Sequence, residues 1–132
     1  FERYPAMLKR RKEIIMRYDS AFRPLGVETL DHYTESHSSS GHLYITHIPG
    51  ITEDSRNEII IKMAERGIAC NVHYKPLPMH TAYKNLGFDI ADYPNAYAHF
   101  ANEITLPLHT CLTDEDVDYV IRQYTEILKE YI

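Results

Sequence analysis

The sequence predicts an α+β domain of two layers, in which three or four short, mainly antiparallel strands pack against helices on one side. Two observations lead to this fold class. Segments with a helical apolar repeat are interspersed with extended segments that are too short for a doubly wound parallel sheet. The length of 132 residues also suits one domain with a hydrophobic core. We therefore expect residues 1–132 to form a single domain.

Two long helices are predicted near the ends of the chain. The first begins at Pro5, because proline is tolerated at the first position of a helix, and it ends near Arg23, where a proline and a glycine follow. The last begins after Thr113, which has capping-box spacing with Asp116. Its apolar residues then recur at intervals of three and four to the end of the chain.

The remaining elements are shorter. Extended segments are predicted at residues 27–30, 41–48, 68–74 and 104–108. A helix between the second and third of these segments should begin near Asp54 or Ser55 and end at Gly67. Its expected buried stripe consists of Ile59, Ile60, Met63 and Ala64. Two further short helices are predicted at residues 81–86 and 94–103.

Composition and charge argue against several classes of partner. The net charge of −5 disfavours nucleic acid and acidic membranes, and we interpret the basic run Lys9–Lys12 as a solvated helix face. No segment is long enough to span a membrane, and the first residues lack the apolar core of a signal peptide. The two cysteines, Cys70 and Cys111, lack CxxC spacing, so we expect unpaired thiols and a cytoplasmic protein.

Known metal and nucleophile motifs are missing. Although the chain has eight histidines, His42 and His47 should point to opposite faces of one strand. His73 and His80 could converge, but no HExxH motif or zinc-type Cys/His spacing accompanies them. The chain also lacks GxSxG and a glycine-rich phosphate loop. We therefore predict no metal site and no catalytic nucleophile.

The segment IACNVHYKPLPMHTAY, residues 68–83, carries the candidate binding residues. His73, Tyr74 and Lys75 leave the third extended segment, and two prolines then lead to His80. A loop stiffened by proline can present such hydrogen-bonding groups to an anionic or hydroxylated ligand. In the alternative interpretation, His73 is hydrogen-bonded within the sheet and His80 caps a helix. The residues alone leave both interpretations open.

Four motifs occur in a fixed order along the chain. They are GHLYITHI at 41–48, ERGI at 65–68, NVHYKPLPMHTAY at 71–83 and PNAYAHFANEITLPLHTCLTDEDVDYVI at 94–121. Together they resemble the C-terminal domain of the DegT/StrS family of pyridoxal-phosphate-dependent sugar aminotransferases. The resemblance extends from the first helix to the last residue. Thr110 and Cys111 stand where a proline is common in the family.

The resemblance implies the small domain of a two-domain, fold-type I enzyme that works as a homodimer. It implies that the large domain of the same chain holds pyridoxal phosphate. The enzyme would transfer an amino group from an amino acid, commonly glutamate, to a keto sugar attached to a nucleotide. The motif match assigns substrate binding to His73, Tyr74, Lys75, His80 and Tyr83.

The family's Schiff-base lysine motif is absent from the sequence, and none of the six lysines has that context. We therefore expect a fragment without catalytic residues or bound cofactor, inactive alone. An apolar face left by the missing large domain is expected on the first helix or on residues 41–48. The alternative is a stand-alone ligand-binding, regulatory or oligomerisation module of the same fold.

Overall fold

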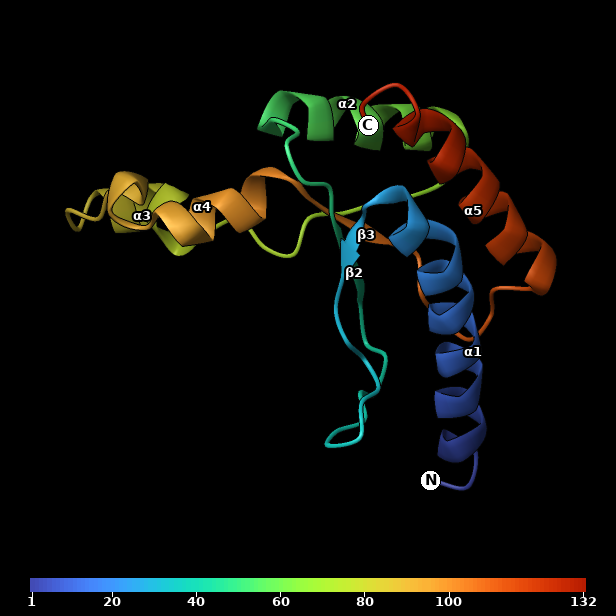
Figure 1. The fold of residues 1–132 in the computed structure, drawn as a ribbon. Helices are drawn as coiled ribbons and strands as arrows, with labels where there is room; N and C mark the ends of the chain where they lie inside the picture. Colours follow the sequence, from blue (N-terminus) through green and yellow to red (C-terminus); the bar gives the residue numbers. More distant parts are fainter.

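The computed structural model describes residues 1–132 and has an α+β fold (Figure 1). Its helices are α1 (Tyr4–Phe22), α2 (Glu53–Glu65), α3 (Thr81–Lys84), α4 (Pro94–Ala101) and α5 (Asp114–Leu128). Its strands are β1 (Glu28–Thr29), β2 (Tyr44–His47) and β3 (Glu103–Leu106), which form one antiparallel sheet in the order β1-β2-β3. This confirms the predicted fold class. No helix is long and apolar enough to cross a membrane.

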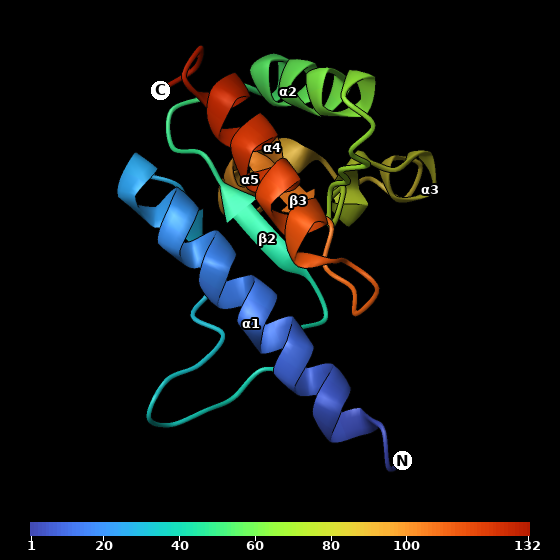
Figure 2. The same ribbon diagram turned by 90° about the vertical axis from the view of Figure 1, so that its right-hand side faces the viewer.

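The two faces of the sheet have different surroundings. β2 lies in the middle and pairs with β3 so that Tyr44 is opposite Leu106 and His47 is opposite Glu103. Side chains alternate along a strand, and therefore Tyr44 and Leu106 share the face that α1 and α5 cover (Figures 1 and 2). His47 and Glu103 share the opposite face, which these two helices leave uncovered.

Aromatic rings fill the core between the sheet and the two long helices. The ring centroids of Tyr18 and Tyr44 lie 4.9 Å apart, and those of Phe22 and Tyr124 lie 5.1 Å apart, edge to face. Tyr124 also contacts the Thr46 hydroxyl at 2.9 Å, while this hydroxyl donates to a backbone carbonyl at 2.6 Å. Burial raises the pKa of Tyr124, so its hydroxyl stays neutral and donates to Thr46.

The basic run on α1 is only partly solvated. Lys9 and Lys12 are exposed as expected, but Arg10 reaches α5. Its Nη1 donates to the Asp114 carboxylate at 2.8 Å and its Nη2 donates to the backbone carbonyl of Leu112 at 2.7 Å. The prediction of a fully solvated face was therefore wrong, because the first turn of α5 places acceptors beside this part of α1.

The expected strand at residues 68–74 is reduced to a single bridge. Only Asn71 pairs with β3, through two backbone hydrogen bonds to Thr105 of 2.8 and 3.1 Å. Side chains take the neighbouring backbone donors: the Asn71 side chain accepts from Val72 N–H at 2.8 Å, and the Glu103 carboxylate accepts from His73 N–H at 2.8 Å. These side-chain acceptors, one local and the other on β3, compete with a sheet ladder, so no longer strand forms.

Helix α2 begins earlier than predicted. Its cap is Thr52, whose hydroxyl accepts a hydrogen bond from Ser55 N–H at 3.2 Å, so Ser55 lies inside the helix. Ile59 and Met63 of the expected stripe are buried, but the third buried residue of α2 is Arg56. The apolar repeat could not reveal Arg56, because its burial depends on partners far away in the sequence.

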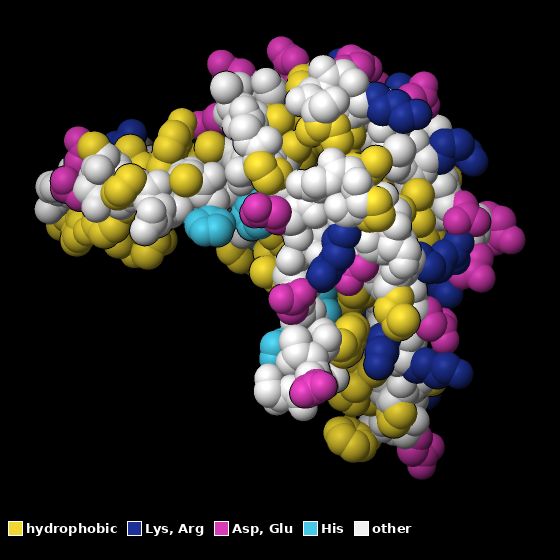
Figure 3. All heavy atoms as spheres, viewed as in Figure 1, with side chains coloured by type: hydrophobic (Ala, Val, Ile, Leu, Met, Phe, Trp, Pro, Cys, Tyr) yellow, Lys and Arg dark blue, Asp and Glu magenta, His cyan; other side chains and the backbone are white.

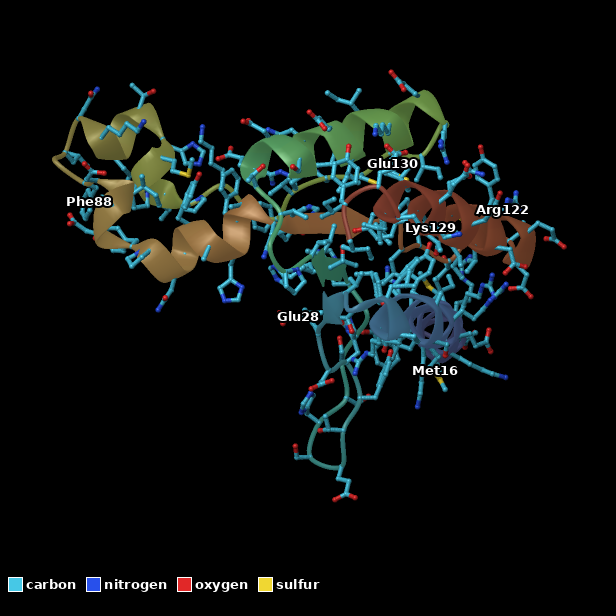
Figure 4. The ribbon with its side chains drawn as sticks, turned by 45° about the horizontal axis from the view of Figure 1, so that its top comes forward. Met16, Glu28, Phe88, Arg122, Lys129 and Glu130 are labelled. Carbon is cyan, nitrogen blue, oxygen red and sulfur yellow. The ribbon has the colours of Figure 1, made fainter.

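Residues 74–99 form an arm that projects from the body of the molecule and carries α3 and most of α4 (Figure 1). None of these residues is buried. The large apolar side chains that the arm exposes are Tyr74, Leu77, Leu86, Phe88, Tyr93 and Tyr97. Apolar atoms accordingly cover much of its lower side in Figure 3, and Phe88 lies at its far end (Figure 4). Helix α1 also exposes Met7 and Met16, but the sequence did not predict the larger apolar surface of the arm.

The capping box of α5 provides a test of the fold. Thr113 accepts from Asp116 N–H at 3.1 Å, and the Asp116 carboxylate accepts from Thr113 N–H at 2.9 Å, as predicted. Thr113→Ala should lower the free energy of unfolding by about 1 kcal/mol, measured by urea denaturation. Thr125→Ala is the control, since that hydroxyl of α5 makes no hydrogen bond, and it should cause no loss. Equal losses in both variants would contradict a specific role for the cap.

Candidate functional site

The uncovered face of the sheet holds a small hollow of about 220 Å³ at the base of the arm, where polar groups stand among apolar side chains. Its polar and aromatic lining comes from His47, His73, Tyr74, His99, Phe100 and Glu103. Figure 3 shows histidine side chains at the surface where the arm meets the body. These residues belong to β2, to the segment after the Asn71 bridge, to α4 and to β3, so the hollow depends on the fold and not on one motif.

Glu103 supplies a buried carboxylate to this hollow, with an exposed fraction of 3%. Its Oε2 accepts from His73 N–H at 2.8 Å and its Oε1 accepts from the Thr105 hydroxyl at 2.5 Å. A buried carboxylate is costly unless hydrogen bonds or a cation compensate it. The hydrogen bonds meet this condition. The buried guanidinium of Arg56 donates to the backbone carbonyl of Glu103 at 3.4 Å, whereas its ion pair is with the carboxylate of Glu53 at 3.6 Å.

The charge on Arg56 is balanced by several acceptors. Burial lowers the pKa of Arg56, while the carboxylates of Glu53 and Glu103 oppose that change. The guanidinium also lies 4.6 Å from the centre of the Phe100 ring, and its Nη1 donates to the Phe100 carbonyl at 3.1 Å. Arg56 thereby ties α2 to the end of α4 and the start of β3, where the hollow lies.

His73 is held by one edge of its ring. Its Nδ1 lies 2.9 Å from the Thr105 hydroxyl oxygen, whereas its Nε2 has no hydrogen-bond partner in the chain. Tyr74 stands edge-on to this ring at a centroid distance of 4.7 Å and is 72% exposed. Both residues line the hollow. One ring edge of His73 is thus fixed, while the other is available to a ligand.

Three of the predicted binding residues lie outside the hollow. The Nε2 of His80 donates to the carbonyl oxygen of Lys75 at 3.3 Å, and the ammonium of Lys75 is exposed without a partner. Tyr83 lies on α3, where it packs against Phe88 at 6.1 Å between ring centres. The structure therefore brings His73 and Tyr74 together and leaves the other three along the arm. The substrate-binding role of all five residues stays a prediction.

The alternative interpretation of the two loop histidines is met in part. His73 is hydrogen-bonded to a β3 residue, as that interpretation expected. His80 occupies the position before α3, but its side chain does not cap the helix. Each histidine is therefore tied to the chain by one ring nitrogen only.

Sequence reasoning missed several residues of the hollow. His47 and His99 meet with ring centres 5.0 Å apart, and His47 Nδ1 contacts Asn102 Oδ1 at 3.0 Å. The alternation of residues 41–48 had placed His47 on the face opposite Tyr44, which was a usable signal. The local sequence gave no signal for Glu103. Of its two hydrogen-bond partners, His73 lies far away in the sequence, and Thr105 lies on the same strand, β3.

The hollow contains no lysine, and none of the six lysines of the chain is buried. Lys62 forms an ion pair with Glu130 at 2.5 Å. The hydrogen bond to Glu130 raises the pKa of Lys62. No group of three or more His, Cys, Asp or Glu side chains could hold a metal ion. The hollow at the base of the arm therefore offers no lysine to which pyridoxal phosphate could be bound covalently.

Comparison with known proteins identifies the chain. Residues 1–125 match the family described as the DegT/DnrJ/EryC1/StrS aminotransferase family. The chain belongs to this family. The match covers nearly the whole chain, and it confirms the resemblance on which the predicted fold and activity rested.

Individual relatives are about three times as long as the chain. It is 33% identical to the spore coat polysaccharide biosynthesis protein SpsC of Bacillus subtilis, over 97% of this chain and 34% of that protein. It is 29% identical to the UDP-4-amino-4,6-dideoxy-N-acetyl-beta-L-altrosamine transaminase of Helicobacter pylori, over 96% of this chain and 34% of that enzyme. The pyridoxal-phosphate form of a putative sugar aminotransferase, Spr1654 of Streptococcus pneumoniae, superposes with a TM-score of 0.95 and 55% identity, over 99% of this chain and 33% of that one. The chain therefore spans about one third of these relatives.

The positions of the lysines predict how the chain behaves with pyridoxal phosphate. After incubation with a low concentration of pyridoxal phosphate and reduction with borohydride, we expect no lysine to be labelled stoichiometrically. The hollow at the base of the arm contains no lysine, no lysine of the chain is buried, and a specific site needs lysine and cofactor cradle together. Peptide mapping by mass spectrometry measures the labelling. The Spr1654 protein provides a positive control. Full labelling of a single lysine in this chain would contradict the prediction.

Proposed function

We propose that this chain is the small, C-terminal domain of a pyridoxal-phosphate-dependent enzyme that transfers an amino group from an amino acid, glutamate, to a nucleotide-linked keto sugar. The observation that carries the proposal is the hollow at the base of the arm. It presents imidazole and tyrosine groups that suit a hydroxylated ligand, but it has no lysine for the cofactor. Family membership and the named activities of the relatives support it.

The cofactor and the lysine that binds it belong, in this proposal, to a large domain of the same chain. When bound, pyridoxal phosphate supplies the chemistry that carries the amino group between the two substrates. The residues of this chain form the adjoining wall of the substrate site, where His73 accepts hydrogen bonds from sugar hydroxyls and Tyr74 packs on the ligand. This domain alone is then inactive.

The arm supports a partner surface beyond this chain. No residue from 74 to 99 is buried, yet six large apolar side chains are exposed there. Exposed apolar area of this kind marks an interaction surface. Since the relatives are about three times as long, we propose that the arm packs against the large domain and the second subunit of a homodimer. Two free cysteines and a nucleotide-sugar substrate fit a cytoplasmic location.

One relative favours a second candidate function. The chain is 28% identical over 93 residues to a pleiotropic regulatory protein of Geobacillus stearothermophilus. A regulatory or oligomerisation module would bind a related ligand without turnover. The two candidates differ in whether an amino group is transferred.

The decisive experiment uses the longer protein that contains this chain, with pyridoxal phosphate, glutamate and a panel of nucleotide-linked keto sugars. We expect an aminated sugar nucleotide and an equal amount of 2-oxoglutarate, both detected by mass spectrometry. Omitting glutamate is the control and should abolish both products. Binding of a sugar nucleotide without any product would instead favour the regulatory function.

Lys75 offers a prediction about the nucleotide. Its ammonium is exposed, and Lys75 directly follows Tyr74, which lines the hollow. A lysine suits a phosphate as a point charge. We propose that it contacts the diphosphate. Lys75→Ala should raise KM for the sugar nucleotide about 10- to 150-fold, with kcat little changed, since the contact is the same in ground and transition states. Lys84→Ala, an exposed lysine of the same arm, is the control. A KM for Lys75→Ala within about twofold of wild type would rule out the contact.

A further inference from the structure

Glu103, Thr105 and His73 form a chain of hydrogen bonds that has a direction. Thr105 lies between the other two, with its hydroxyl oxygen 2.5 Å from Glu103 Oε1 and 2.9 Å from His73 Nδ1. Glu103 and Thr105 are both buried, with exposed fractions of 3% and 5%. Water therefore does not compete for the hydrogen bonds of the Thr105 hydroxyl. The hydrogen of this hydroxyl must point either to Glu103 or to His73.

The carboxylate decides which neighbour receives that hydrogen. An ionised carboxylate only accepts hydrogen bonds, and each oxygen of Glu103 has a group that can donate to it, His73 N–H on Oε2 and the Thr105 hydroxyl on Oε1. The Thr105 hydroxyl therefore donates to Glu103. The distance of 2.5 Å is in the range found for O–H···O⁻ bonds. The Thr105 oxygen is then left as an acceptor for His73.

A neutral imidazole carries one hydrogen on one of its two nitrogens. Because the Thr105 oxygen accepts, the hydrogen of His73 must be on Nδ1, and Nε2 must be bare. We propose that Glu103 and Thr105 are positioning residues that hold His73 in the Nδ1–H form, so that its Nε2 serves as a hydrogen-bond acceptor in the hollow. This inference deepens the proposed function and rests on it for the identity of the ligand.

A second imidazole of the hollow, that of His47, also carries its hydrogen on Nδ1. His47 Nδ1 faces the amide oxygen Asn102 Oδ1 at 3.0 Å, and since this oxygen only accepts, His47 also carries its hydrogen on Nδ1. Both rings line the same hollow, so two of its polar groups have a ring nitrogen that can accept a hydrogen bond from a ligand. The ligand atoms that enter it are sugar hydroxyls, and the diphosphate is placed outside.

The protonated nitrogen of His73 can be observed directly. We would label histidine isotopically, record long-range nitrogen–proton correlation spectra at mildly alkaline pH, where free histidine is neutral, and assign His73 through the signal lost in His73→Gln. The wild-type protein should show His73 protonated at Nδ1. Thr105→Val, which has the same shape without the hydroxyl, should shift the ring to the Nε2–H form. Thr105→Ser, which keeps the hydroxyl, should restore the Nδ1–H form.

We call the hydrogen-bonded chain from Glu103 through Thr105 to His73 the relay. The outcomes distinguish loss of the relay from a general disturbance of the fold. The exposed residues His42 and His109 are internal controls, and their signals should be the same in all variants. A wild-type His73 protonated at Nε2 would overturn the proposal. So would a Thr105→Val protein that keeps the Nδ1–H form with unchanged control signals.

Kinetics of the longer enzyme distinguish this inference from the function on which it rests. Loss of one neutral hydrogen bond in Thr105→Val should raise KM for the sugar nucleotide about 2- to 10-fold, and Thr105→Ser should reverse the change. If the spectra show the relay but His73→Gln leaves KM unchanged, the substrate role of His73 is wrong and the relay stands. If His73→Gln raises KM while Thr105→Val leaves the ring form unchanged, the relay is wrong and the substrate role stands.

Discussion

The buried guanidinium of Arg56 is the contact on which the arrangement of the site depends. It leaves α2 and donates to the carbonyl of Phe100 at the end of α4, and to that of Glu103 at the start of β3. The carbonyls at the end of a helix have no partner within it and attract a cation. One side chain thus joins three elements and fixes the direction in which the chain turns from the arm into the sheet.

The position of Glu103 follows from that turn, and the position of His73 follows from Glu103. The region contains a buried cation and a buried carboxylate, and each has its own hydrogen-bond partners. Buried charges contribute little net stability compared with apolar residues, but removing a partner leaves the charge uncompensated. Their effect here is geometric, because they fix the position of the segment after Asn71, which forms no strand.

The elements set by local sequence could be predicted, and those set by distant partners could not. Periodicity and capping predicted α1 and α5. Alternation predicted β2 and placed His47 on the face opposite His42 and Tyr44, but it did not show which face the helices cover. The segment after Asn71 contained the residues of a strand, but the Glu103 carboxylate captured the backbone donor of His73 that a strand would have used. No local sequence pattern indicates a hydrogen-bond acceptor that lies 30 residues away. For the same reason, the resemblance to the family named His73 and Tyr74 as candidate binding residues but did not point to Glu103 and Thr105, to which His73 is hydrogen-bonded.

The arm has a consequence for the turnover of the proposed enzyme. A segment without any buried residue has little contact energy to offset its loss of conformational entropy, so its local opening requires little free energy. In the proposed enzyme, an arm that no partner covers would be open to a protease or a chaperone. Subunits that fail to assemble would then be recognised by this segment and removed, while burial of the arm in the assembled enzyme would protect it from the same degradation.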